Sequence, residues 1–352
     1  MRSYNFRNVE EALPEMLRAI ERLGVERPSR NGPVRQFDQD VAIRYENPTE
    51  RVLFFPERDA NPFFHLAECL WMIAGRNDVE FPARFVKNFG QFSDNGKTFN
   101  GAYGYRWRFH FETSDGYPID QIQTIVQALK KDPTGRRLLI SMWDGHHDFG
   151  LNSKDIPCNL LAIPKIAPNG KLDLTVFNRS NDLIWGALGA NAVHFSFLQE
   201  YLAGLIGVEV GAYTQVSTNM HAYTELGGMW DKCAPLIDLT TKMEPFRGRY
   251  SRGTVSALPI FYNNASTNDQ VWREDIGMLI EEGPVVGIRI PWLRRVAIPM
   301  LMAHQHYSEG EGLDRYDGAI EIVSQCQSED WKLAATEWLE RRRQAAIDKG
   351  LA

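Results

Sequence analysis

The chain has 352 residues and a formal net charge of −6, with 43% hydrophobic and 24% charged residues. This composition is typical of a globular protein and argues against non-specific binding to nucleic acid or to an anionic membrane. Its four cysteines are far apart and form neither a CxxC pair nor a zinc spacing, and we expect no metal site. Without a signal core, a membrane-spanning stretch or a linker, we expect a cytoplasmic protein with one domain over residues 1–352.

Apolar periodicity predicts helices over about Val9–Leu23, Phe63–Ala74 and Ile119–Lys131. The second of these segments is almost wholly apolar, yet it carries the carboxylate of Glu68 in its middle. A buried carboxylate is costly unless it is paired or used in chemistry. Glu68 is therefore either a structural partner for a buried arginine or amide, or a functional residue.

Strands are predicted over Arg137–Trp143, Cys158–Pro164 and Lys171–Asn178, and a buried helix over Ala192–Ile206. Asn169-Gly170 separates the last two strands and suits a type I′ turn, so these strands should be antiparallel neighbours. This mixed order of elements predicts an α+β fold rather than a doubly wound sheet.

Cys158 directly follows a proline at the start of an apolar run. Most unpaired cysteines are small buried hydrophobes, and the alternative is a nucleophile. Other polar groups flank the predicted strands: Arg136-Arg137, the stretch Asn178–Asp182, and the pair His221 and Tyr223 on one strand face. A guanidinium beside a serine hydroxyl suits phosphate binding. Taken singly, each group could also be a solvated pair, a polar loop or a satisfied core histidine.

Taken in order, these segments resemble the thymidylate synthase superfamily. The motifs that carry the resemblance are SRNG (29–32), HLAECLW (65–71), NGAYGYRWR (100–108), DPTGRRLLISMW (132–143), PCN (157–159), RSND (179–182), GALGAN (186–191) and NMHAY (219–223). The resemblance covers roughly residues 25 to 225 and implies a mixed sheet packed by helices, dimeric through the sheet. In that superfamily a cysteine adds to C6 of a pyrimidine nucleotide, and C5 then attacks the one-carbon unit of 5,10-methylenetetrahydrofolate.

The resemblance also implies roles for individual residues. The catalytic group would be Cys158, Glu68 and Tyr103; the phosphate-binding group Arg30, Arg136, Arg137, Arg179 and Ser180; the base-binding group Asn191 and Asn159; the sugar-binding group His221 and Tyr223; and the folate-binding residue Asp182. The substrate would be a pyrimidine nucleoside monophosphate. Arg136 and Arg137 would act across a homodimer interface, with neither a membrane nor a nucleic acid needed for activity.

Four departures from the superfamily pattern bear on the reaction. Asn159 stands where a histidine is usual, and one extra residue between Arg179 and Asn191 could put Ala190 in the place of Asn191. Phe89 and Phe92 stand where tryptophans are usual. Beyond about residue 235 the resemblance ends, and a charged amphipathic helix closes the chain in place of a short apolar tail.

These departures imply a site that water can enter, and water could then add to the bound methylene group in place of hydride. The leading expectation is therefore a C5 hydroxymethyltransferase acting on dCMP, CMP or dUMP. A thymidylate synthase that releases dihydrofolate is the first alternative. A non-catalytic nucleotide- or RNA-binding regulator is the second, although binding alone would not require Cys158, Glu68 and Tyr103.

Overall fold

The computed structural model describes residues 1–239, 246–263, 265–283 and 286–350. A six-stranded mixed sheet has the order β1-β4-β9-β7-β6-β5, and a four-stranded sheet has the order β2-β3-β10-β8. The strands of the first sheet are β1 Arg2–Phe6, β4 Val41–Tyr45, β9 Val210–Ser217, β7 Leu172–Asn178, β6 Asn159–Ile166 and β5 Ile140–Ser141; those of the second are β2 Gly24–Arg27, β3 Val34–Phe37, β10 Met220–Tyr223 and β8 Asn181–Asp182. The predicted α+β class with a mixed sheet is confirmed.

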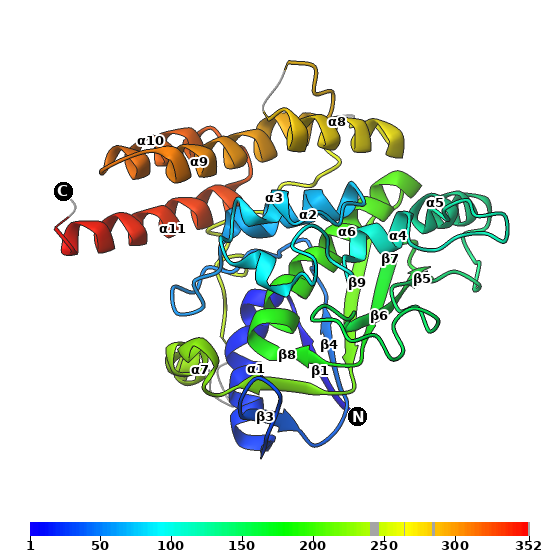
Figure 1. The fold of residues 1–352 in the computed structure, drawn as a ribbon, viewed down its shortest axis with the longest axis horizontal. Helices are drawn as coiled ribbons and strands as arrows, with labels where there is room; N and C mark the ends of the chain where they lie inside the picture. Colours follow the sequence, from blue (N-terminus) through cyan, green and yellow to red (C-terminus); the bar gives the residue numbers. More distant parts are fainter. Residues whose placement is uncertain (240–245, 264, 284–285, 351–352) are drawn as a thin grey trace.

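Four of the longer helices lie where periodicity predicted them. They are α1 Val9–Leu23, α2 Pro62–Ile73, α5 Gln121–Lys131 and α6 Asn191–Ile206. Asn8 caps α1 by accepting a hydrogen bond from the backbone N–H of Glu11 at 3.0 Å. Helix α6 is buried on nearly every side because it packs between the large sheet and α2 (Figure 1).

The predicted hairpin is present, but its predicted turn type is wrong. Strands β6 and β7 pair antiparallel, and the turn closes with a hydrogen bond from Gly170 N to Ala167 O at 2.8 Å. Gly170 has a φ of 81°, whereas Asn169 is not among the residues with positive φ. A type I′ turn needs positive φ at both central residues. Pro168, with its fixed negative φ, instead suits the second position of a turn over Ala167–Gly170.

The predicted strand Arg137–Trp143 is confirmed only over β5, Ile140–Ser141. Residues 136 to 139 have no strand pairing, and Leu139 is 48% exposed. Strand β5 lies at the edge of the sheet and pairs only with β6. By the antiparallel register of β5, residues 136–139 would face residues 163–166 of β6, but they do not pair with them.

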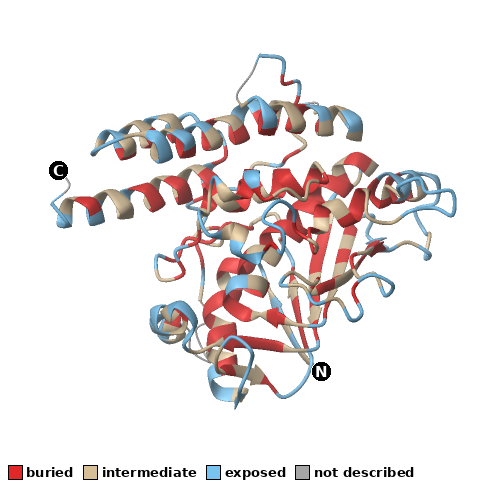
Figure 2. Ribbon diagram, in the orientation of Figure 1, coloured by how far each residue is buried: buried red, intermediate tan, exposed pale blue. Residues whose placement is uncertain are grey.

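Beyond residue 268, four helices form a layer on the far side of α2 from the sheet (Figure 1). Its helices are α8 Asp269–Glu281, α9 Ile298–Glu309, α10 Asp314–Ser324 and α11 Glu329–Asp348. The faces that these helices turn toward α2 or toward one another are buried, and their outer faces are exposed (Figure 2). The predicted C-terminal helix is confirmed as α11. In the described part of the chain, no helix has the length and hydropathy needed to cross a bilayer.

The shorter elements fill the connections. They are α3 Glu80–Ala83, α4 Tyr103–Arg108, α7 Met229–Cys233, the 3₁₀ turns η1 Phe89–Phe92, η3 Leu226–Gly228 and η4 Ala234–Leu239, and the π-helical segments η2 Leu183–Ala190 and η5 Leu293–Ala297. Two of them, η1 and η2, border the cavities described next.

Candidate active site

Cys158 lies immediately before β6 and is half-buried. The phenolic oxygen of Tyr103, the first residue of α4, accepts hydrogen bonds from the backbone N–H of Cys158 at 3.3 Å and of Asn159 at 3.2 Å. Two elements far apart in sequence are therefore joined at the candidate nucleophile. The predicted pairing of Cys158 with Tyr103 in one site agrees with this geometry.

A cavity of about 200 Å³ lies beside Tyr103 and includes Glu68 and Asn191 in its wall. A larger cleft of about 1030 Å³ adjoins it and includes Arg30. Both cavities are lined by the same three residues from two short elements: Phe89, Phe92 and Ala190. Among the described residues, those that line either cavity all lie between residues 30 and 227.

Two opposing influences act on the thiol. Burial raises the pKa of Cys158, the guanidinium groups of Arg179 and Arg30 lower it, and the carboxylate of Asp155 raises it. The net pKa lies above the ordinary value. Arg179 is held beside the thiol because its Nε donates to the carbonyl oxygen of Pro157 at 2.9 Å. A bound phosphate or base that changes this balance would change the thiolate fraction.

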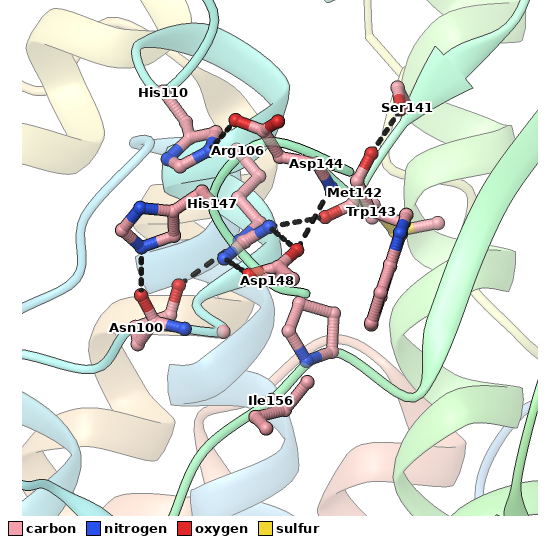
Figure 3. A network of polar contacts seen from close by, with 12 residues as sticks. Asn100, Arg106, His110, Ser141, Met142, Trp143, Asp144, His147, Asp148 and Ile156 are labelled. Atoms are coloured by element: carbon pink, nitrogen blue, oxygen red, sulfur yellow. Dashed lines mark hydrogen bonds and ion pairs between the residues drawn. The ribbon is translucent and has the colours of Figure 1, made fainter. Parts of the chain in front are cut away.

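The chain that leads to Cys158 is held by a buried ion pair (Figure 3). Arg106 donates from Nη1 and Nη2 to the two carboxylate oxygens of Asp148 at 2.7 and 2.8 Å, and from Nη1 to the carbonyl of Met142 at 2.7 Å. Arg106 Nε also donates to the carbonyl of Asn100. Such a bidentate pair fixes geometry as well as charge, so the loop before the nucleophile is positioned by α4.

Asn191 remains in the site despite the extra residue before it. The π-helical segment η2 precedes it, and one turn of π-helix accommodates an additional residue. Its side-chain Oδ1 accepts from Asn159 Nδ2 at 3.2 Å, and its Nδ2 donates to Asn181 at 3.0 Å. Asn191 therefore lines the small cavity, and Ala190, the residue that could take its place, lines both cavities.

A chain of hydrogen bonds from Ala187 through Gln215 and Asn181, here called the relay, fixes the orientation of the Asn191 amide. Gln215 Nε2 donates a hydrogen bond to the carbonyl oxygen of Ala187 at 2.6 Å. Because a carbonyl oxygen can only accept, the amide nitrogen of Gln215 must face Ala187. Gln215 Oε1 therefore faces the other way and accepts from Asn181 Nδ2 at 3.2 Å. Asn181 Oδ1 in turn must face Asn191 Nδ2. The amide of Asn191 is thus not free to flip.

The predicted phosphate-binding residues divide into two groups. Arg30 lines the large cleft, and Ser180 follows Arg179 in the turn that ends β7. Arg136 and Arg137 are exposed in the segment before β5, line neither cavity and form no ion pair within the described part of the chain. The chain by itself therefore does not bring Arg136 and Arg137 to the cavities that it forms.

The predicted sugar- and folate-binding residues lie together on the small sheet but outside the walls of both cavities. His221 of β10 lies opposite Asp182 in the register of the parallel strands β10 and β8. The ring of His221 lies edge-on to that of Tyr223, with the ring centroids 5.2 Å apart. Burial raises the pKa of Asp182, whose Oδ2 is buried without a hydrogen-bond partner. Its other oxygen caps η2 by accepting from Trp185 N.

Two polar residues of the small cavity were not predicted. Asp155 accepts a hydrogen bond from Gly101 N at 2.7 Å, and His194 of α6 lies with its Nε2 3.0 Å from Glu68 Oε2. His194 follows Asn191 by three residues, which places both on one helix face. That spacing was readable in the sequence once Asn191 had been assigned to the site. Within the described residues, no group of three or more metal-ligating side chains comes together.

The arrangement can therefore support nucleophilic addition by a thiol that lies beside the small cavity, with groups for proton transfer in the cavity wall. The family model for thymidylate synthase matches residues 12–259. A deoxyuridylate hydroxymethyltransferase of Pseudomonas phage M6 is 49% identical over 100% of this chain and 99% of its own length. An enzyme of that name from Bacillus phage SP01 is 44% identical over 53% of this chain and 49% of its own. A thymidylate synthase of Corynebacterium aurimucosum is 31% identical over 46% and 60%.

Proposed function

Because the chain belongs to the thymidylate synthase family of one-carbon transferases, we propose that it is a deoxyuridylate hydroxymethyltransferase. In this role it converts dUMP to 5-hydroxymethyl-dUMP, with water and 5,10-methylenetetrahydrofolate as the other reactants. The observation that carries the proposal is the 49% identity over the whole chain with an enzyme of that name. The identity extends through the C-terminal helices, which lie beyond the matched family model.

The chemistry begins at Cys158. Its thiolate adds to C6 of the pyrimidine and makes C5 nucleophilic. Arg179 favours the thiolate because its positive charge lies beside the sulfur. Tyr103 keeps the nucleophile in place through the two backbone N–H groups that it accepts. In the proposal Glu68 and Tyr103 also move protons around the base.

The large cleft fits the one-carbon donor. Its walls include four aromatic side chains, from Phe64, Phe89, Phe92 and Trp185, and flat rings of this kind pack well against a pteridine. When bound, methylenetetrahydrofolate supplies the one-carbon unit to C5. Asp182 lies behind the cleft wall, where one oxygen accepts from the backbone N–H of Trp185 and the other has no hydrogen-bond partner, and we assign it to support the pterin ring.

Access of water supports the hydroxymethyl product over the methyl product. No residue beyond 227 lines either cavity among the described residues, because the C-terminal helices pack behind α2. Phe92 in the cavity wall is itself 49% exposed. Excluding water is what a closing segment contributes to hydride chemistry, and here water can compete for the methylene group.

The choice of uracil rests on Asn191. Uracil presents a donor and an acceptor at N3 and O4, cytosine presents the reverse at N3 and N4, and a flipped amide could pair with either. Because the relay from Ala187 fixes the amide, Asn191 can match only one of the two bases in a given pose. The names of the relatives favour uracil and deoxyribose. We assign Asn159 to support Asn191, and His221 and Tyr223 to the sugar.

The phosphate site is proposed to be shared between two subunits. Arg30, Arg179 and Ser180 would hold the phosphate from one subunit of a homodimer, and Arg136 and Arg137 would reach it from the partner. Their exposure next to the edge strand β5, away from both cavities, supports that placement. The phage relatives also support action in the cytoplasm of an infected host cell.

The test is to incubate the protein with methylenetetrahydrofolate and separately with dUMP, dCMP or CMP, then to identify the product by mass. The proposal expects 5-hydroxymethyl-dUMP from the first mixture and little from the others. A hydroxymethyl product from dCMP or CMP alone would overturn the assignment of the base. Binding of dUMP without any product would favour the non-catalytic alternative.

A further inference from the structure

We propose that His194 is the base that deprotonates the attacking water, and that Glu68 holds this water beside it. The inference rests on the proposed hydroxymethyl transfer and goes beyond it, since it assigns the step that sets the product. Among the described residues around the small cavity, His194 is the nitrogen acceptor best placed for this role.

The contact between these two side chains is incomplete. His194 Nε2 lies 3.0 Å from Glu68 Oε2, but the ring is not aligned for a hydrogen bond, and both atoms are buried without a hydrogen-bond partner. The side chains are 4% and 13% exposed respectively. Unpaired buried polar atoms cost free energy, so two of them that face each other at a cavity mark a place for a polar guest.

A water molecule fits this place. Both residues line the small cavity of about 200 Å³ together with Tyr103 and Asn191, and one water occupies about 30 Å³ of liquid volume. Asn191 and His194 are three residues apart on α6, so the group that reads the base and the proposed base for water lie on one helix face. The water is therefore held close to the pyrimidine edge.

The other candidates near the cavity are already engaged. The hydroxyl oxygen of Tyr103 accepts hydrogen bonds from two backbone N–H groups, and burial raises the pKa of this phenol, so Tyr103 is less suited than His194 to take a proton from water. Asp155 Oδ2 accepts from Gly101 N, and this carboxylate lies near the thiol whose pKa it raises. The amides of Asn159 and Asn191 are not bases. His194 and Glu68 are left with free acceptor atoms.

The step balances without an oxidant or reductant. At the intermediate, Cys158 sulfur is bonded to C6 and C5 carries an exocyclic methylene conjugated to the C4 carbonyl. The water oxygen bonds to the methylene carbon, its proton goes to His194 Nε2, and the electron pair of the C5–methylene double bond moves to the C4 oxygen. Collapse of this enolate forms the C5–C6 double bond and expels Cys158 as a thiolate.

The experiment follows dUMP labelled with tritium at C5, because loss of that label precedes the attack of water. Wild-type protein should release tritium and form 5-hydroxymethyl-dUMP in equal amounts. In His194→Ala and His194→Gln, release should continue while product falls by about 100-fold, the usual contribution of a general base. Added 2-mercaptoethanol should then capture the methylene group as a thioether, and added imidazole should restore product in His194→Ala.

Glutamine retains a polar side chain that can hold water but cannot take its proton, so His194→Gln separates positioning of water from proton transfer. Calorimetric binding of dUMP to each variant shows that the site is still folded. If release and product fall in parallel in both variants, His194 has only a structural role and the inference is wrong. The inference is also wrong if Asp155→Asn releases tritium without forming 5-hydroxymethyl-dUMP while the His194 variants form the two in equal amounts. If wild-type protein itself makes a methyl product, the proposed function fails first.

Discussion

The hydroxyl oxygen of Tyr103 accepts the backbone N–H of Cys158 at 3.3 Å. Tyr103 begins α4, and the same short helix supplies Arg106, which holds the loop before the nucleophile through Asp148. The first turn and a half of one helix therefore positions both the reactive residue and its approach. This local support explains how a half-buried cysteine at a strand end can keep a defined position beside the small cavity, whose wall includes Tyr103.

Replacing Tyr103 with phenylalanine removes the acceptor for two backbone N–H groups. Each unsatisfied buried donor costs about 1–3 kcal/mol, so we expect a lower free energy of unfolding and slower formation of the covalent adduct at Cys158. Denaturant unfolding and the rate of ternary complex formation with 5-fluoro-dUMP and methylenetetrahydrofolate measure these effects. Tyr105→Phe in the same helix is the matched control. Equal adduct rates in the two variants would contradict the role assigned to Tyr103.

The shared phosphate site predicts complementation between inactive variants. Arg136→Ala and Cys158→Ser should each be inactive, but in a mixed dimer the intact Cys158 of one subunit meets the intact Arg136 of the other. After subunit exchange, an equal mixture should regain about a quarter of wild-type activity, as expected for random pairing in a two-fold dimer.

The control for this experiment is a mixture of Arg179→Ala with Cys158→Ser. Arg179 lies beside the thiol of its own subunit, so no mixed dimer contains an intact site and activity should stay absent. Activity that fails to return in the Arg136 mixture, with exchange verified by mass, would place Arg136 outside the partner's site.

The fixed amide of Asn191 predicts a change of base preference. Asn191→Asp leaves only acceptors at this position, which disfavours O4 of uracil and suits the N4 amino group of cytosine. With about 1–3 kcal/mol for each mismatched buried group, the ratio of kcat/KM for dUMP over dCMP should fall by about 5- to 150-fold. Steady-state kinetics with both nucleotides measures the ratio.

Gln215→Met tests the relay without touching the cavity. The substitution removes the group that orients Asn181 and, through Asn181, Asn191. The ratio of kcat/KM for dUMP over dCMP should therefore move closer to one. A loss of kcat/KM by the same factor for both nucleotides would show that Gln215 contributes stability alone.

The burial of Glu10 makes the stability of the fold depend on pH. Burial raises its pKa to about 7 from an ordinary value of 4.5, although Oε2 accepts the backbone N–H of Arg249 at 2.8 Å. The folded state therefore prefers the protonated carboxyl. Its contribution to stability is complete below about pH 4.5 and is lost as the pH rises toward 7, with a limiting slope of about 1.4 kcal/mol per pH unit.

Glu10→Gln removes this titration. The variant should gain stability relative to wild type between pH 5 and pH 8, measured as the free energy of unfolding in denaturant at both pH values. Glu21→Gln, at an exposed position of the same helix, should show no such gain. A difference in unfolding free energy that does not grow with pH would refute the assignment to Glu10.

The sequence was sufficient for the elements whose pattern is local. Helices α1, α2, α5 and α6 begin and end within two residues of their predicted bounds because their apolar spacing and caps are set by nearby residues. The strand predicted over Arg137–Trp143 was too long, because strand pairing depends on a neighbour that the local sequence does not contain. The turn at Asn169-Gly170 was assigned the wrong type because the effect of Pro168 was overlooked.

The site was predictable only in part for a related reason. Cys158, Tyr103 and Asn191 lie in motifs and come together as expected. His194 lies in a helix that is buried on nearly every side, so the hydrophobic pattern of this helix did not show which face points into the site. Its contact with Glu68 joins α6 to α2 and depends on tertiary packing. The same holds for the relay from Gln215 to Asn191.

The most direct test of the account is to run the reaction with dUMP in water enriched in oxygen-18. Attack of water on the methylene group predicts that the new hydroxymethyl group carries the heavy oxygen, and that no absorbance rise from dihydrofolate accompanies turnover. A methyl product without the label, formed in step with that absorbance rise, would contradict the account and identify the protein as a thymidylate synthase.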